Sequence, residues 1–134
     1  MGIRAIDRDV VKQVIVIRRD LKMRRGKEIA QGSHASSAFL LARLRERGAA
    51  VLGEFDEDTR AWLTAGCAKI CVRVDSEAEL VALHERARDA GLESHLIRDA
   101  GHTEFGGVPT LTCCAIGPAR SERLDPITGQ LTLY

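Results

Sequence analysis

Residues 18–38 read RRDLKMRRGKEIAQGSHASSA and directly follow the apolar run VIVI at residues 14–17. An uninterrupted apolar run of this kind is typical of a strand that is buried on both faces. Six of the first ten residues of the longer segment are Lys or Arg, which indicates a basic loop after the strand. Lys27, Gln31 and His34 then follow at i, i+4 and i+7, and at about 100° per residue they fall on one side of a helix. We therefore expect a strand, a basic loop and a helix with a polar face.

This helix is expected to run from residue 24 or 25 to residue 47, where Gly48 ends it. Ile29, Leu40 and Leu44 point away from the polar face, so we expect them to form the apolar back of the helix. The small residues in its middle allow the backbone to lie close to a sheet, another helix or a ligand. A basic loop that leads into a Lys/Gln/His face is typical of a site for an anionic, polymeric substrate.

The rest of the chain alternates between strand patterns and helix patterns. Strands are expected at residues 11–19, 69–75, 95–98 and 110–116, and further helices at residues 56–64 and between Ser76 and Gly91. Asp56 and Ser76 are the expected N-caps of these two helices. Residues 125–129 are expected to form a turn before an extended tail at residues 131–134.

This order of elements predicts an α/β fold. We expect one compact domain over residues 1–134, with a four-stranded mixed β-sheet and helices on both faces of that sheet. Residues 1–10 are a candidate flexible segment. A chain of 134 residues is long enough to bury a substantial core without disulfides or metals.

Positive charge is concentrated at the N-terminal end of the chain. The net charge is only +1, but residues 1–30 hold nine Lys or Arg against four Asp or Glu, a balance of +5 that leaves −4 for the remainder. A basic end on a nearly neutral protein favours a local anion-binding surface, such as one for a nucleic acid backbone. The alternative is a solvated run of charges with no partner.

The four cysteines are Cys67, Cys71, Cys113 and Cys114. The N-terminus is charged and lacks the apolar core of a signal peptide, and no apolar run approaches the roughly 20 residues of a membrane span. We therefore expect no membrane partner and a reducing, cytoplasmic compartment in which the cysteines stay free thiols. Because the pair at 67 and 71 lacks a second pair with metal-ligand spacing, no metal site is expected.

Three motifs of well-known catalytic and nucleotide-binding sites are absent from the sequence. Gly26-Lys27 lacks the upstream glycine of a P-loop, and neither G-x-G-x-x-G nor G-x-S-x-G occurs. Nucleotide hydrolysis, dinucleotide binding and serine-hydrolase chemistry are therefore poorly supported.

A second polar cluster, RDAGHTE at residues 98–104, begins where the third strand ends. Strand ends are where α/β sheets bind ligands. Asp99 is the candidate acid, base or orienting carboxylate, Gly101 allows a backbone N–H to approach a substrate, and Thr103 offers a hydroxyl. The alternative for this cluster is a polar turn in which Asp99 bonds to its own backbone. For His34, the alternative is an ordinary, partly buried helix histidine.

Four sequence blocks occur in a characteristic order. The first has the pattern R-x-D-L-K-M-x-x-G-K-x-x-A-Q-x-x-H-A and starts at Arg18. It is followed by IRDAG at residues 97–101 with Thr103, by Thr112 ahead of Gly-Pro, and by D-x-I-T-G-x-L at residues 125–131. Over residues 12–134 the chain thereby resembles the archaeal and eukaryotic-type peptidyl-tRNA hydrolases, the second class of that activity.

The resemblance implies hydrolysis of the ester that joins a peptide, or an N-blocked amino acid, to the 3′ ribose of tRNA. This reaction recycles tRNA from peptidyl-tRNA that is released during translation. The resemblance also implies a compact α/β fold with a four-stranded mixed sheet, often a homodimer, and no metal or cofactor. The family's catalytic residues map onto Lys27, His34, Asp99 and Thr112, with Gln31 and Thr103 beside them.

The chemistry of ester hydrolysis agrees with these residue types. Asp99 or His34 could orient or deprotonate the attacking water, and Lys27 could stabilise the developing negative charge or hold the terminal phosphate. Thr112 or a backbone N–H near Gly101 could donate to the oxyanion. The expected phosphate contacts do not depend on base sequence and weaken as salt rises; they come from Arg18, Arg19, Lys22, Arg24 and Arg25.

Three positions depart from the family pattern. Gly32 stands where relatives usually carry Cys or another small apolar residue, while His102 and Glu104 replace a cation and an amide. The last two make the rim of the expected site less positive, which weakens tRNA binding there. They motivate a second hypothesis, a non-catalytic member that binds tRNA or a protein partner through the same basic surface. A third hypothesis is a small-metabolite domain with no role in RNA binding.

Overall fold

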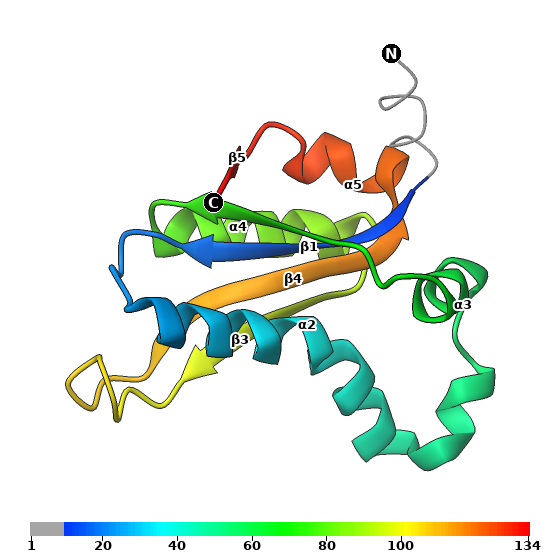
Figure 1. The fold of residues 1–134 in the computed structure, drawn as a ribbon, viewed down its shortest axis with the longest axis horizontal. Helices are drawn as coiled ribbons and strands as arrows, with labels where there is room; N and C mark the ends of the chain where they lie inside the picture. Colours follow the sequence, from blue (N-terminus) through cyan, green and yellow to red (C-terminus); the bar gives the residue numbers. More distant parts are fainter. Residues whose placement is uncertain (1–9) are drawn as a thin grey trace.

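A computed structural model describes residues 10–134 (Figure 1). Residues 1–9, most of the candidate flexible segment, lie outside the described residues. Within the described range there are four α-helices, one 3₁₀ helix and five strands. In chain order these elements are β1 (Val11–Arg18), α2 (Arg25–Arg47), η1 (Gly48–Gly53), α3 (Glu57–Thr64), β2 (Lys69–Val74), α4 (Glu77–Asp89), β3 (Ser94–Asp99), β4 (Thr110–Arg120), α5 (Ser121–Thr128) and β5 (Thr132–Leu133).

The strands form one mixed sheet in the order β3-β4-β1-β2-β5. β1 is central: it runs parallel to β2, with Val16 opposite Val72, and antiparallel to β4, with Val16 opposite Cys114. The expectation of a mixed α/β sheet is confirmed, but the expected number of four strands is wrong. The chain's last residues add β5, in which Leu133 pairs with Val72. A strand of two residues is too short to leave an alternating pattern in the sequence.

Helices lie on both faces of the sheet, as the burial of β1 requires. Val14 and Val16 point to one face, where they join a core cluster with Leu80 of α4 and Leu124 of α5. Ile17 points to the other face and packs in a separate cluster with Ala35 of α2. Because successive side chains of a strand alternate between faces, one apolar run supplies both cores.

The side of α2 that faces the sheet differs from the expected one. Its buried apolar residues include Ala35 and Phe39, whereas Ile29 is 64% exposed. Small residues face the sheet because they let the helix approach closely: a Cβ at Gly32 would lie 3.7 Å from Ile15. That distance is an ordinary van der Waals contact, so packing alone does not require glycine at position 32.

The distal part of α2 is held by an aromatic cluster rather than by the sheet. Phe39 makes edge-to-face contacts with Phe55 and Trp62, at centroid distances of 6.2 and 6.1 Å. Leu40 and Leu44, two of the three residues expected on the apolar back, are partly buried against this cluster. Edge-to-face aromatic pairs add roughly 0.5–1.5 kcal/mol each beyond their buried area.

Two expected helix caps are confirmed. The side chain of Asp56 accepts a hydrogen bond from the backbone N–H of Thr59 at 2.7 Å, and that of Ser76 accepts one from Glu79 at 3.1 Å. Each bond satisfies a backbone donor that a helix start leaves without a partner. These contacts involve neighbours in sequence, which is why the sequence alone predicts them.

The expectation of a turn at residues 125–129 is wrong, because residues 125–128 form the end of helix α5 and Gly129 is its C-cap. Pro126 lies inside the helix, where a proline removes a backbone donor. Packing outweighs that penalty: Leu124 is fully buried and Ile127 is 5% exposed, both against the sheet. The strand expected at residues 110–116 also continues further, to Arg120.

Candidate active site

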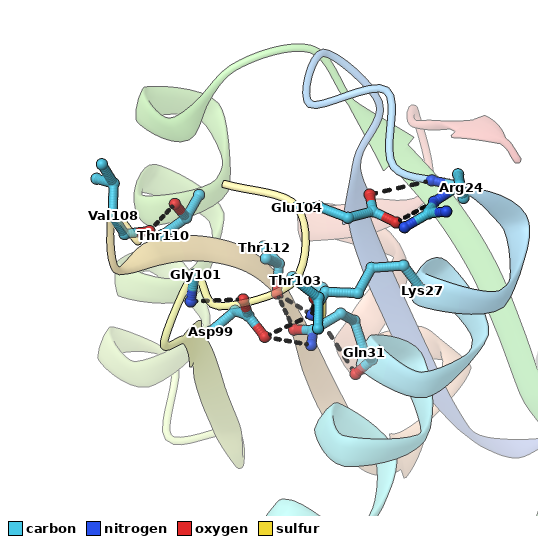
Figure 2. Close-up of polar contacts among 11 residues, drawn as sticks. Arg24, Lys27, Gln31, Asp99, Gly101, Thr103, Glu104, Val108, Thr110 and Thr112 are labelled. Atoms are coloured by element: carbon cyan, nitrogen blue, oxygen red, sulfur yellow. Dashed lines mark hydrogen bonds and ion pairs between the residues drawn. The ribbon is translucent and has the colours of Figure 1, made fainter. Parts of the chain in front are cut away.

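Asp99 is the centre of a hydrogen-bond network at the end of β3 (Figure 2). Its Oδ1 accepts hydrogen bonds from Lys27 Nζ at 2.8 Å and from Gln31 Nε2 at 3.1 Å. Its Oδ2 accepts one from the backbone N–H of Gly101 at 2.8 Å. The first two donors come from α2, about 70 residues earlier in the chain. The polar face of α2 and the polar cluster after β3 thus meet in one place.

The hydrogen bond from Lys27 lowers the pKa of Asp99 below its ordinary value, and the bonds from Gly101 and Gln31 act in the same direction. Burial raises the pKa of Asp99, but by less than these hydrogen bonds lower it. Asp99 is therefore an ionised carboxylate at neutral pH. A carboxylate has about four acceptor positions, and three of those of Asp99 are used within the described residues. The remaining one lies on Oδ2.

Lys27 is held between β3 and the loop that follows it. Its side chain is only 15% exposed, and besides Asp99 its Nζ donates a hydrogen bond to Thr103 Oγ1 at 2.8 Å. The ring of Phe105 lies 5.8 Å from the ammonium. Since an ammonium has three N–H donors, these contacts leave one donor of Lys27 for a ligand.

Thr112 lies on β4 and contacts the network from within the sheet. Its hydroxyl donates to Gln31 Oε1 at 2.5 Å, which orients the Gln31 amide so that its NH₂ group faces Asp99. The side chain of Thr112 is fully buried. In this structure its hydroxyl is thus in contact with Gln31 and not exposed to a substrate, unlike the oxyanion donor that the sequence suggested.

Gly101 has a geometric role that a larger residue could not fill. Its φ is +87°, in the left-handed region, and a Cβ there would lie 2.2 Å from the carbonyl oxygen of Val108. The loop closes further through a hydrogen bond from the Gly107 N–H to the Gly101 carbonyl at 2.8 Å. Because the Gly101 N–H already bonds to Asp99, it orients the carboxylate and is not available to an oxyanion.

His34 lies beside this network and is exposed. It lines a groove of about 490 Å³ between α2 and β3 together with Gln31 and Asp99. Its imidazole makes no hydrogen bond to any residue from 10 to 134. The groove therefore presents an unengaged histidine next to a carboxylate.

The exposed members of the basic segment lie between β1 and the first turn of α2. Arg19, Lys22 and Arg25 are exposed and form no ion pair with another described residue. Arg24 is also exposed, but its Nε donates to Glu104 Oε1 at 2.8 Å. The segment thus offers a set of cations next to the Lys27 site.

Arg18 differs from these neighbours. It is 9% exposed, its guanidinium forms two hydrogen bonds with Asp20, at 2.6 and 3.1 Å, and it donates to the Leu111 carbonyl at 3.0 Å. Glu77 Oε1 lies 3.6 Å from Nη1 of the same guanidinium. These contacts leave little of Arg18 for a phosphate, so it serves to tie β1 to β4 instead.

Sequence reasoning missed two contacts that hold the site. One is the ion pair of Arg24 with Glu104, 80 residues apart; the other is the thiol of buried Cys113, which donates to the Gln31 carbonyl at 3.3 Å. No local pattern marks either of them. The sequence indicates Glu104 only as an acidic residue that makes the rim of the expected site less positive.

The described part of the chain shows no group of three or more His, Cys, Asp or Glu that could hold a metal ion. Cys67, Cys71, Cys113 and Cys114 are free thiols. No helix within residues 10–134 is both long enough and apolar enough to cross a membrane.

Comparison with known proteins relates this geometry to a family. The family model described as Peptidyl-tRNA hydrolase PTH2 matches residues 11–134. The chain belongs to this family. Every residue of the network around Asp99 lies within the matched range, as does the basic segment between β1 and α2.

Individual relatives of the PTH2 family support the same assignment. The peptidyl-tRNA hydrolase of Methanocaldococcus jannaschii is 46% identical, over 92% of this chain and 99% of its own length. That of Methanopyrus kandleri is 47% identical, over 91% and 97%. The probable peptidyl-tRNA hydrolase 2 of Dictyostelium discoideum is 42% identical, over 92% of this chain and 54% of its own length.

Proposed function

We propose that this protein hydrolyses peptidyl-tRNA: water cleaves the ester between a peptide, or an N-blocked amino acid, and the 3′ ribose of tRNA. The observation that carries the proposal is the network of Asp99, Lys27, Gln31 and Thr112, which joins two distant sequence blocks beside a set of exposed cations. Membership of the PTH2 family supports the same reaction. The products are a peptide with a free carboxylate and a tRNA with a free 3′ hydroxyl.

The attacking water is bound by Asp99 and His34. The unused acceptor position on Asp99 Oδ2 and the unengaged imidazole of His34 support this role, because both belong to the same groove. The Asp99–His34 pair removes a proton from the water as its oxygen attacks the carbonyl carbon. That proton reaches the ribose oxygen when the ester bond breaks.

Lys27 stabilises the oxyanion that forms on the carbonyl oxygen. Its charge is held in place by Asp99 and Thr103, so little reorganisation is needed when negative charge develops. The third N–H donor is the one that meets the oxyanion. Gln31 and Thr112 are positioning residues, since they act on the substrate only through Asp99.

The phosphate backbone of the tRNA is bound by the exposed cations, which are Arg19, Lys22, Arg24 and Arg25. Such contacts carry no base specificity, and they weaken as salt rises because binding releases counterions. Arg18, which the sequence also suggested, is left out because its guanidinium is bonded within the protein.

The alternative of a non-catalytic protein that uses the same surface is not favoured. His102 and Glu104, which motivated it, lie outside the network, and Lys27, Gln31, Asp99 and Thr112 are bonded to one another. The relatives that we compared are also named as hydrolases. The small-metabolite hypothesis has no supporting observation.

An assay with N-blocked aminoacyl-tRNA tests the proposed function. Purified protein is expected to release the N-blocked amino acid with multiple turnovers and without added metal. Four phosphate contacts predict that log KM rises with log salt concentration with a slope of about 3, which is on the order of 50-fold between about 50 and 200 mM salt. Tight tRNA binding without turnover would contradict the proposal and support the non-catalytic alternative.

The finer expectations of a homodimer and a cytoplasmic location are also part of this proposal. An apolar groove of about 500 Å³ lies on the β1–β2 side of α2, beside exposed Ile29 and Tyr134. A second copy of the chain that packs on this groove would bury its apolar surface, which supports the dimer. Free thiols, among them exposed Cys71, support a reducing compartment. Sedimentation of the purified chain as a monomer at micromolar concentration would contradict the dimer.

A further inference from the structure

Glu104 binds the start of α2 at the rim of the candidate active site (Figure 2). Its Oε1 accepts a hydrogen bond from Arg24 Nε at 2.8 Å, and its Oε2 accepts one from the Arg24 backbone N–H at 3.3 Å. The Glu104 side chain is 14% exposed, whereas that of Arg24 is 81% exposed. The carboxylate is thus the anchored partner, and the arginine is the partner that solvent can reach.

This ion pair borders the cavity that leads to Lys27. The cavity has a volume of about 430 Å³ and is lined by Arg24, Gly26, Lys27, Thr103 and Glu104. Both cations of the lining are bonded to carboxylates of the chain itself, Arg24 to Glu104 and Lys27 to Asp99. The positive charge next to the candidate active site is therefore largely neutralised before a substrate arrives.

Arg24 is exceptional among the exposed cations of this segment. Arg19, Lys22 and Arg25 form no ion pair with other described residues, so a phosphate can bind each of them without displacing an acid. The guanidinium of Arg24 is instead already paired: one of its five N–H donors binds Glu104, so a phosphate that binds the other donors meets a charge that Glu104 offsets. The phosphate therefore binds an ion pair with little net charge and not an isolated cation.

We propose that Glu104 is a specificity-determining residue, which offsets the charge of Arg24 and thereby weakens the binding of tRNA at the rim of the site. The inference rests on the proposed function. Arg24 contributes its full charge to the binding of an RNA backbone only when residue 104 is uncharged. The acid therefore raises KM without taking part in bond cleavage.

The test is Glu104→Gln, which removes the charge but keeps the shape and one carbonyl acceptor. An exposed ion pair contributes modestly, so KM is expected to fall by roughly two- to fivefold while kcat stays the same. The slope of log KM against log salt should steepen by less than the roughly 0.7 to 0.9 of one full phosphate contact, because the existing contact of Arg24 is strengthened. The Kd of a tRNA that carries an N-blocked aminoacyl group in a non-hydrolysable amide linkage should fall by the same factor.

Two further variants separate this effect from a general change of charge. Glu54→Gln removes the same charge beyond the opposite end of α2, where Glu54 pairs with Arg47 at 2.7 Å, and should leave KM and Kd unchanged. In an Arg24→Gln background, Glu104→Gln should no longer lower KM, because the cation that Glu104 offsets is gone.

Three results would overturn the inference: a KM and Kd that Glu104→Gln leaves unchanged or raises, a gain of the same size in the Arg24→Gln background, or a fall in kcat alone, which would assign Glu104 to the structure of the loop. A failure of the proposed function is distinguishable from these. If wild-type protein binds the amide analogue without hydrolysing the ester substrate, the proposed reaction is wrong, and the Kd comparison still decides the role of Glu104.

Discussion

The Asp99→Asn variant is expected to lose about 10²- to 10⁴-fold in kcat/KM for peptidyl-tRNA hydrolysis while remaining folded. The carboxylate accepts hydrogen bonds on both oxygens, from Lys27 and Gln31 on one and from Gly101 on the other. An asparagine amide has only one acceptor oxygen, so its NH₂ group must face a donor in either orientation. Lys27 also loses its counter-charge. The measurement is single-turnover and steady-state hydrolysis of N-blocked aminoacyl-tRNA.

The same substitution should lower the free energy of unfolding by only about 1 to 3 kcal/mol, which leaves a typical domain folded. Asp99 has a lower pKa in the folded protein than its ordinary value of 3.8. Its contribution to stability is therefore fully present above that value and is lost as the pH falls through the lower, folded pKa. Urea unfolding of wild type and variant from neutral to acidic pH should show the stability difference shrinking on acidification.

Asp125→Asn is the matched control for this prediction. Asp125 also pairs with a lysine, Lys12 at 3.0 Å, but its side chain is 51% exposed and it belongs to α5. This variant should keep wild-type kcat and KM. Full activity of Asp99→Asn would show that the carboxylate neither binds the water nor holds Lys27, and the site assignment would then be wrong.

Gly101→Ala is expected to lower both stability and activity. A Cβ would lie 2.2 Å from the Val108 carbonyl oxygen, and the residue has a φ of +87°, so backbone strain and a steric clash add. Together they should reduce the free energy of unfolding by about 2 to 5 kcal/mol. Because the same loop carries Thr103 and orients Asp99, kcat/KM should fall by more than about tenfold, which corresponds to a loss of roughly 1.4 kcal/mol in transition-state stabilisation.

Gly106→Ala separates the two causes. Gly106 also has a positive φ, +60°, but a Cβ there would meet nothing within 4 Å. Its substitution should therefore cost only the backbone strain, about 1 kcal/mol, and leave activity nearly unchanged. If urea unfolding gave the two variants equal stability, the contact between Gly101 and Val108 would not be the constraint that we describe.

Most of the secondary structure could be predicted because it depends on neighbours in sequence. The run at residues 14–17, the polar face of α2 and the caps Asp56 and Ser76 all follow from spacings of one to seven residues. The errors lie where packing outweighs such patterns. α5 contains Pro126 yet is helical because Leu124 and its neighbours are buried, and β5 is too short to have a period.

The candidate site shows the same division. Residue types and spacing were sufficient to select Lys27, Gln31 and Asp99. They could not distinguish a residue that is accessible to a substrate from a buried residue that only orients its neighbours. Thr112 is fully buried beneath Gln31, and the Gly101 N–H is bonded to Asp99. One or the other was expected to donate to an oxyanion.

Residue order alone establishes the strand, the basic loop, the helix with its Lys/Gln/His face and the family to which they point, because each of these features depends on residues that lie close together in the sequence. The fold assigns each charge its role. Arg18 and Arg19 are identical and adjacent, yet one bonds to the Leu111 carbonyl inside the protein while the other is exposed. Arg24 meets Glu104 only through a loop 80 residues away. Hydrogen bonds and ion pairs act over a few ångströms, so their partners are set by packing in three dimensions and not by distance along the chain.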